Sequence, residues 1–371
     1  MNIIVTGGCG FIGRVVVRML LEKGHRVKII DSLLPQVHGP GLLTTPTPVR
    51  LEDNWFVSVG TASRVGGEFW AGTDAVVHLA AEVGVGQSQY EPARYVSANA
   101  LETAALWERI VATGSVSAVV VASSMSVYGE GLYTVNGNAI PGGGFERPDP
   151  INPKDWDEMH WHGVTAKGIA PMQTVEEKRV EPASVYAMSK YDTEMYSLLQ
   201  GRAYEVSTAA LRFFNCLGPE QALSNPYTGV LAAFGCRALN DRPGRINEDG
   251  RQSRDFIYVD DVAAAVVHAL ELRLSGAYNV CTGIATTVGE LSHMLTTLAK
   301  SPPGEVVGEF RVGDTRHCYG SPAKLEATGW KAKVSVEEAV ARTFAWMKTQ
   351  PIPKDRHDAA TSEMRERGLL K

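Results

Sequence analysis

A tyrosine and a lysine four residues apart are the side chains in this sequence best suited to proton transfer. On a helix, Tyr186 and Lys190 would share one face, since positions i and i+4 are neighbours there. A phenol is a poor base at its usual pKa of about 10, but a nearby ammonium favours the phenolate. Such a phenolate can remove a proton from a hydroxyl group as hydride leaves the same carbon. Ser124, after a β-branched run, would hydrogen-bond that hydroxyl and relay the proton. The spacing alone is also common on structural amphipathic helices, so the assignment depends on other motifs.

A glycine-rich turn near the N-terminus indicates what accepts the hydride. The segment Thr6 to Gly13 follows the strand-like run Ile3-Ile4-Val5 and places Gly7, Gly10 and Gly13 where a strand turns into a helix. Glycine tolerates positive φ and lets the backbone approach a pyrophosphate at the helix N-terminus. An ordinary tight turn is the alternative for the pattern taken alone.

The end of the second strand-like run indicates which dinucleotide binds. Asp31 lies there, placed to accept hydrogen bonds from a ribose 2′-hydroxyl and to repel a 2′-phosphate. The sequence therefore predicts NAD⁺ rather than NADP⁺, and the positive charge of its nicotinamide would join the ammonium in favouring the phenolate. An ordinary turn residue is the alternative for Asp31.

The elements that position these groups alternate along the first half of the chain. Strand-like runs at 3–5, 27–30, 75–79 and 118–122 are separated by helical patterns that begin near residue 12 and near residues 92–112. Such alternation predicts an α/β fold with a doubly wound parallel sheet covered on both faces. The second half predicts helices at 186–200, 288–299 and 336–347, a strand at 206–211, a strand and helix over 256–270, one helix within 218–250, and a final exposed helix after Pro353.

Composition excludes several classes of protein. The 371 residues are 44% hydrophobic and carry a net charge of −5, which gives no bulk attraction to nucleic acid. The five cysteines are scattered without a Cys-x-x-Cys pair, as expected in a reducing cytoplasm. Strand-like residues follow Met1-Asn2 directly, with no leader pattern, and no apolar run approaches the roughly 20 residues of a membrane helix. We therefore expect a cytoplasmic protein without membrane contact.

Together these motifs resemble the extended short-chain dehydrogenase/reductase family, and within it the sugar-nucleotide epimerases and dehydratases. The similar segments cover nearly the whole chain: Thr6 to Gly13, His78 to Ala81, Asn99, Ser123 to Gly129, Tyr186 to Lys190, Arg212 to Asn215, and Arg254 to Ile257. Residues 31–39, 81–88 and 224–229 most resemble the dTDP-L-rhamnose 4-epimerases. The resemblance implies a Rossmann domain over 1–217 and 256–282, with an insertion at about 132–182, and a smaller α/β subdomain over 218–255 and 283–371 that binds a nucleotide-diphospho-sugar.

The resemblance also implies roles for individual residues. Catalysis falls to Ser124, Tyr186 and Lys190. NAD contacts are implied for Gly7, Gly10, Phe11, Ile12, Gly13, Asp31, Leu79, Ala80, Ala81, Asn99, Tyr186, Lys190 and Phe213. Substrate contacts are implied for Glu82, Ser124, Ser126, Asn215, Asn225, Thr228, Arg254, Arg316 and Cys318. Of these, Asn215, Arg254 and Arg316 would hold the diphosphate, and the small Cys318 would open the sugar pocket to larger groups. The alternative for the arginines is that they are surface residues paired with neighbouring carboxylates.

The residues after Ser124 indicate the reaction. Related dehydratases have an Asp-Glu pair there and decarboxylases a Glu two positions on, whereas this chain has Met125 and Ser126, which take no proton near neutral pH. A 4-keto sugar without an eliminating base can only rotate and take its hydride back on the other face, which is 4-epimerisation. Glu82 or Glu130 acting as a base would overturn this. A dehydratase, decarboxylase or 4-ketoreductase, and a non-catalytic NAD-binding regulator, remain alternatives.

Two features depart from the family pattern. Relatives have an Asp after the third-strand glycine that contacts adenine, but Gly60 is followed here by Thr61-Ala62-Ser63-Arg64, so that contact is lost or mediated by water. The insertion lacks the paired cysteines of some relatives, and the two histidines of His160-Trp161-His162 do not make a metal site.

Family members pair through the helix of the catalytic tyrosine and the helix before it, so we expect a homodimer, although Met188, Met195 and Leu199 could equally face the protein's own core.

Overall fold

The β-branched runs pair into one large sheet. The computed structural model describes residues 1–38, 49–52, 55–135, 138–139, 145–146, 160–161, 164–165, 169–223, 229–353 and 355–371. Among these residues the largest sheet has eight strands, in the order β18-β13-β6-β5-β1-β2-β4-β3, and every pair is parallel except β3 with β4. The strands are β1 (Asn2–Thr6), β2 (Arg26–Asp31), β3 (Val49–Glu52), β4 (Trp55–Val59), β5 (Ala75–His78), β6 (Ala118–Ser124), β13 (Ser207–Phe213) and β18 (Gly276–Val280).

Helices cover both faces of this sheet because successive strand residues point to opposite sides. Ile3 and Val5 pack with α1 (Phe11–Glu22) and α9 (Val259–Glu271) on one face. Ile4 packs on the other face with α6 (Glu102–Thr113) and α7 (Val185–Ala203). The doubly wound α/β prediction is confirmed. The single helix expected over 92–112 is instead α5 (Pro92–Tyr95), a π-helical turn (Val96–Leu101) and α6.

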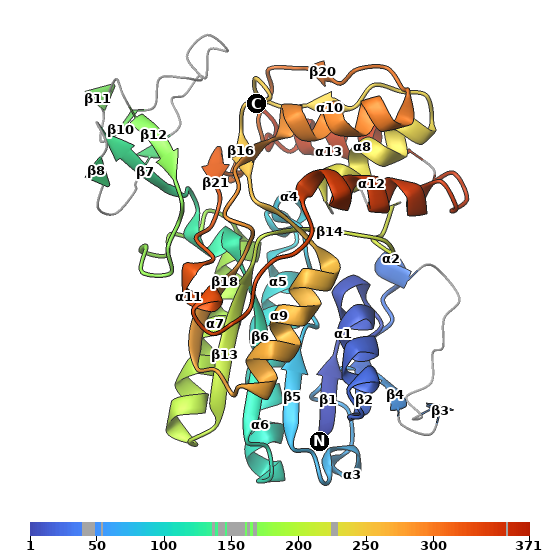
Figure 1. Ribbon diagram of the computed structural model, residues 1–371, viewed down its shortest axis with the longest axis vertical. Helices are drawn as coiled ribbons and strands as arrows, with labels where there is room; N and C mark the ends of the chain where they lie inside the picture. The colour runs from blue at the N-terminus through green and yellow to red at the C-terminus, as the bar shows by residue number, and fades with distance from the viewer. Residues whose placement is uncertain are drawn as a thin grey trace.

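A second hydrophobic cluster lies beyond the carboxyl ends of the strands. It joins α8 (Val230–Leu239), α10 (Val288–Ala299) and α12 (Val336–Met347) around Phe234, Leu291 and Phe344. Figure 1 shows these helices and α13 (His357–Glu366) above the sheet. Short ladders connect the layers: β14 (Asn215–Leu217), β15 (Arg245–Ile246), β16 (Ser253–Arg254), β17 (Phe256–Tyr258), β19 (Thr286–Thr287), β20 (Glu305–Val306) and β21 (His317–Cys318).

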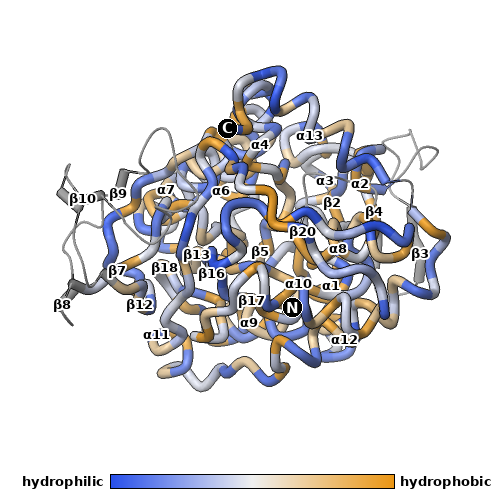
Figure 2. The backbone as a smooth tube through the Cα atoms, turned by 90° about the horizontal axis from the view of Figure 1, so that it is seen from above, coloured by the Kyte–Doolittle hydropathy of each residue, from blue (hydrophilic) through white to orange (hydrophobic). Residues whose placement is uncertain are grey.

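Two parts of the chain differ from the sequence expectations. The stretch around 132–182 contains short strands, β7 (Leu132–Val135) to β12 (Ile169–Met172), including β8 (Asn138–Ala139), β9 (Phe145–Glu146), β10 (His160–Trp161) and β11 (Val164–Thr165). The strands β7 and β12 lie on the side of the molecule opposite β4 (Figure 2). The C-terminal helix α13 is not simply exposed, because Ala360 and Met364 are buried.

Short helices complete the fold: α2 (Pro35–His38), α3 (Gly67–Trp70), α4 (Val85–Ser88), η2 (Met125–Tyr128) and α11 (Ala323–Glu326). None of the described helices could cross a bilayer.

A buried histidine at the end of β5 makes stability depend on pH. His78 lies between two hydroxyls, with Nδ1 2.7 Å from Thr6 Oγ1 and Nε2 3.0 Å from Thr103 Oγ1. Burial, helped by the charge of Lys190, lowers the pKa of His78 to about 3. The unfolded chain therefore binds a proton between pH 6.5 and 3 that the folded chain does not, and stability falls as pH falls through this window. At pH 5 we expect a loss of roughly 2 kcal/mol from this residue.

Melting temperatures measured from pH 8 to pH 5 test this expectation. A His78→Gln variant should be less stable than the parent at pH 8, and the difference should narrow toward pH 5. Parallel curves for the two proteins would contradict the assignment.

Candidate active site

The carboxyl ends of β1, β2, β5, β6 and β13 open into one large cavity. Its volume is about 540 Å³, and its lining combines these strand ends with Asn215, Arg254 and residues 313–315 from the second half of the chain. Ligands of open α/β sheets bind outside the carboxyl ends of the strands. The cavity is therefore the candidate site, and the predicted groups can be placed relative to it.

The N-terminal glycines line this cavity at the start of α1. Gly7 has φ of +70°, and a Cβ built on it would lie 2.7 Å from the backbone nitrogen of Ala80. A Cβ on Gly13 would lie 2.1 Å from the carbonyl oxygen of Gly7. Only glycine allows this close packing of turn, helix and neighbouring loop, which leaves the N-terminus of α1 facing the cavity. Such a backbone cradle fits a pyrophosphate.

Asp31 ends β2 beside this turn and is oriented by backbone donors. Its Oδ2 accepts a hydrogen bond from Cys9 N at 3.0 Å, and its Oδ1 accepts one from Leu33 N at 2.9 Å. His38 Nε2 lies 3.5 Å from Oδ1. Asp31 lines the cavity with its carboxylate fixed against the glycine turn. This is the placement that a ribose hydroxyl beside a bound pyrophosphate requires.

The three predicted catalytic residues line the same cavity. Ser124 ends β6, and Tyr186 and Lys190 come from the first turns of α7, where Ser184 caps the helix by accepting from Ala187 N at 3.1 Å. Ser124 Oγ accepts from Ser126 N at 3.2 Å and from Ser126 Oγ at 2.9 Å. Its own proton therefore remains for the hydrogen bond between Ser124 and Tyr186. The structure brings the hydroxyl pair and the lysine together as predicted.

Burial controls the protonation of this group. It raises the pKa of Tyr186, while the hydrogen bond with Ser124 lowers it by a smaller amount. Burial also lowers the pKa of Lys190 to about 8, against the opposing charge of Glu194. Burial thus opposes formation of the Tyr186 phenolate in the protein by itself. Further positive charge beside the phenol is needed for Tyr186 to act as a base.

A buried ion pair behind the predicted catalytic residues was not predicted from the sequence. Glu194 accepts from Arg212 Nη2 at 2.6 Å and from Ser123 Oγ at 2.6 Å, and it is 1% exposed. It links β6, β13 and α7, and it lies one helical turn beyond Lys190. The i+4 spacing between Lys190 and Glu194 could have indicated that Glu194 lies on the same helix face as Lys190. The pair attaches α7 to the sheet next to the helical turns that carry Tyr186 and Lys190.

Asn99 has a different place from the one predicted. It is 1% exposed and does not line the cavity; its Oδ1 accepts from Glu82 N at 2.8 Å. Its Nδ2 donates to Ser189 Oγ at 2.9 Å. Because both ends of the amide are used within the protein, Asn99 positions the loop after β5 against α7 rather than contacting a ligand. The other predicted cofactor residues, Gly7, Gly10, Phe11, Ile12, Gly13, Asp31, Leu79, Ala80, Ala81, Tyr186, Lys190 and Phe213, all line the cavity.

The predicted substrate residues divide into three groups. Glu82, Ser124, Ser126, Asn215 and Arg254 line the cavity. Two others do not: Arg316 forms ion pairs with Glu248 at 2.7 Å and Asp249 at 2.9 Å, and Cys318 is 1% exposed in a cluster around Phe214. Asn225 and Thr228 lie outside the described residues.

The two carboxylates that could eliminate water are both held by other groups. Glu82 lines the cavity but is paired with Arg94 Nη2 at 2.9 Å. Glu130 accepts from Arg316 N at 2.6 Å and from Tyr133 OH at 2.9 Å, and it does not line the cavity. Both glutamates are therefore engaged with partners within the protein.

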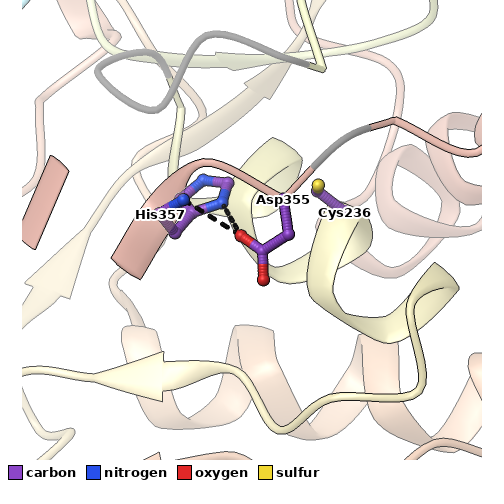
Figure 3. A group of neighbouring side chains, drawn as sticks. All are labelled: Cys236, Asp355 and His357. Carbon is purple, nitrogen blue, oxygen red and sulfur yellow. Dashed lines mark hydrogen bonds and ion pairs between the residues drawn. The ribbon is translucent and has the colours of Figure 1, made fainter. Parts of the chain in front are cut away.

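A second cluster of chemically active side chains lies between α8 and α13. Cys236, Asp355 and His357 place one ligand atom each within 4.8 Å of one another, and the carboxylate lies between the imidazole and the thiol (Figure 3). Asp355 already accepts from His357 Nδ1 at 3.0 Å and from Arg242 Nη1 at 2.8 Å. Since guanidinium charges compete with a metal cation, this cluster is better explained as the anchor of the C-terminal segment to α8.

Comparison with known proteins places these features in a family. The model of the NAD dependent epimerase/dehydratase family matches residues 3–153 and 161–281. The chain is 30% identical over 356 residues to dTDP-L-rhamnose 4-epimerase of Burkholderia thailandensis, and the match covers 93% of this chain and 94% of that protein.

Solved structures give the same result for the fold. The UDP-glucose 4-epimerase of Thermotoga maritima, crystallised with UDP-glucose, has a TM-score of 0.73 and 28% identity, covering 94% of this chain and 99% of that one. The UDP-glucose 4-epimerase of Thermus thermophilus, in complex with NAD, has a TM-score of 0.71 and 28% identity, covering 95% of this chain and 100% of that one.

Proposed function

The chain belongs to the NAD dependent epimerase/dehydratase family, and from that premise we propose that it is a nucleotide-diphospho-sugar 4-epimerase. The proposal comprises an NAD site at the glycine turn and Asp31, a sugar beside Tyr186, and a diphosphate near Asn215 and Arg254. When bound there, NAD would supply the hydride acceptor for C4 of the sugar and a positive charge beside the phenol.

The protein's own residues carry the proton chemistry. Tyr186 removes the proton of the sugar 4-hydroxyl as the hydride leaves, and Ser124 holds that hydroxyl through the hydrogen bond it shares with Tyr186. Lys190 stabilises the phenolate and, by resemblance, holds the nicotinamide ribose. After the 4-keto sugar has rotated in the site, Tyr186 returns the proton to the oxygen on C4 as the opposite epimer forms.

One observation carries the choice of epimerisation. Met125 and Ser126 follow Ser124 in the cavity, where an eliminating acid–base pair would otherwise stand, and both Glu82 and Glu130 are held by other groups. Met125, Ser126 and the two engaged glutamates thus offer the 4-keto sugar no base that would remove its C5 proton or assist loss of a carboxylate. Return of the hydride is the step that the site supports.

A panel of sugar nucleotides tests this proposal. Purified protein is incubated with UDP-, dTDP- and GDP-sugars, including dTDP-L-rhamnose and UDP-glucose, and the products are followed by NMR. An epimeric pair at C4 with no net NADH is the expected result. A 4-keto-6-deoxy product, release of CO₂ or stoichiometric NADH consumption would identify a dehydratase, a decarboxylase or a 4-ketoreductase instead, and no turnover of any sugar would favour a non-catalytic role.

The phosphate contact of Arg254 gives a second test. Arg254 is 8% exposed and lines the cavity. Its guanidinium donates to the carbonyl oxygens of Ser253 and Arg316, each at 2.9 Å. A lysine keeps the charge but loses this fixed fork. Arg254→Lys should weaken binding of UDP or dTDP by about tenfold in calorimetry, the size of one charge-assisted hydrogen bond. The matched control, Arg251→Lys at an exposed position, should bind normally; equal affinities in all three proteins would exclude the phosphate role.

The assembly that we propose is a homodimer. Met188 and Leu199 on α7 are 54% and 50% exposed, and Leu101 before α6 is 61% exposed, so these apolar side chains do not face the protein's own core. A second copy packed on this face would cover them as a four-helix contact. Sedimentation should give twice the chain mass of 40.1 kDa; a monomer would contradict the proposal.

We also propose the cytoplasm as the location and a division of labour between the two halves of the chain. The five cysteines are free thiols, as a reducing compartment keeps them. Residues 1–217 and 256–282 would bind NAD, and residues 218–255 and 283–371 the nucleotide of the substrate.

A further inference from the structure

A carboxylate that the proposed chemistry does not use lines the cavity beside Asp31. Glu102 begins α6, and the cavity wall there also includes Gly60, Thr61 and Ala62 from the loop after β4. This loop and Asp31 are direct neighbours, since Gly60 N donates to the carbonyl oxygen of Asp31 at 2.8 Å. Glu102 therefore lines the cavity together with the loop that neighbours Asp31, where Asp31 would hold a ribose.

The Glu102 carboxylate is held in place rather than free in solvent. Ser63 Oγ donates to its Oε1 at 2.8 Å, and Ser63 N lies 3.3 Å from its Oε2. Ser63 is fixed in turn by Thr61, whose Oγ1 lies 2.9 Å from Ser63 Oγ, and by Arg109 Nη2, which donates to its carbonyl oxygen at 3.1 Å. Each carboxylate oxygen has further lone pairs, so a fixed acceptor faces the ligand.

We propose that Glu102, oriented by Ser63, accepts a hydrogen bond from the 6-amino group of the adenine of NAD. The inference rests on the proposed assignment of NAD to this cavity. A carboxylate accepts hydrogen bonds only, and adenine presents an N–H donor at C6, whereas hypoxanthine presents a carbonyl oxygen that a carboxylate repels. This contact, from another element, would replace the aspartate that is missing after Gly60.

Competition between NAD and nicotinamide hypoxanthine dinucleotide tests the proposal without using activity. Full-length protein is equilibrated with equal excesses of both dinucleotides, starting from either loaded form, and the bound fraction is released and quantified by chromatography. The parent protein should retain NAD over the analogue by about tenfold or more, because the analogue loses a charge-assisted hydrogen bond and gains a repulsion.

Three variants separate the contact from general effects on the site. Glu102→Gln should bring the ratio close to one, since an amide can donate to the hypoxanthine oxygen. Ser63→Ala should lower the ratio by several-fold. The control, Glu108→Gln on the exposed face of the same helix, should leave it unchanged.

The outcomes distinguish this inference from the function on which it rests. A parent that discriminates, with an unchanged ratio in Glu102→Gln, would overturn the role of Glu102 and leave the NAD site intact. A parent that binds both dinucleotides equally would likewise overturn the role of Glu102 and leave the NAD site intact. A parent that binds neither dinucleotide would overturn both the adenine contact and the proposed function.

Discussion

Replacing Tyr186 by phenylalanine should lower turnover by roughly a thousandfold or more while leaving bound NAD and thermal stability close to those of the parent. The substitution removes one hydroxyl, which lies beside Ser124 and lines the cavity, and keeps the ring that packs edge-on against Tyr95 at 6.4 Å between centroids. The loss should appear in kcat as well as kcat/KM, because the phenol acts in the transition state. Turnover is measured by NMR on the substrate identified from the panel, and NAD by its release on denaturation.

Tyr95 provides the matched control. Its hydroxyl donates to Gln87 at 3.3 Å and it does not line the cavity, so Tyr95→Phe should change turnover by less than about fivefold, as expected for one long, neutral hydrogen bond. Comparable losses in the two variants, or full activity in Tyr186→Phe, would remove Tyr186 from the role of base.

Gly13→Ala should deprive the protein of its cofactor. The new methyl group would lie 2.1 Å from the carbonyl oxygen of Gly7 and 2.8 Å from Cα of Gly8, both backbone atoms of the turn, so the turn itself must move. Because the pyrophosphate is expected to be held by this backbone, we predict that NAD affinity falls by at least about a hundredfold, the size of two lost hydrogen bonds to a charged group. Calorimetry or retained NAD after gel filtration measures the loss.

Gly66→Ala is the corresponding control. Gly66 has φ of −61°, and a Cβ built on it meets no atom within 4 Å, so alanine fits without strain. This variant should retain NAD as the parent does. Normal NAD retention in Gly13→Ala would show that the dinucleotide does not lie on the glycine turn.

Local patterns allowed the scaffold and the reacting groups to be predicted. The glycine turn depends on steric limits within a few residues, and Tyr186 and Lys190 depend on one helical turn, so both are visible in sequence. The parallel sheet follows from the alternation of buried strands and helices. These predictions require only short-range geometry.

Contacts between distant segments could not be predicted in the same way. Glu194 meets Arg212 across two elements, and Glu102 meets Ser63 from another, with no periodic pattern that connects them. Asn99 and Arg316 were expected to touch ligands, but their polar atoms are used within the protein, by the loop after β5 and by Glu248 with Asp249. Residue type indicates what a side chain can bind, whereas its neighbours decide what it does bind.

The fate of the C4 hydrogen distinguishes 4-epimerisation from the other reactions of a 4-keto sugar. A sugar nucleotide carrying deuterium at C4 is converted in ordinary water, and the epimer is examined by NMR and mass spectrometry. The proposed site predicts that the epimer keeps its deuterium at C4, because the hydride returns to the carbon it left, and that unlabelled substrate takes up none from D₂O. Loss of the label to solvent, or its appearance at C5 or C6, would contradict the account.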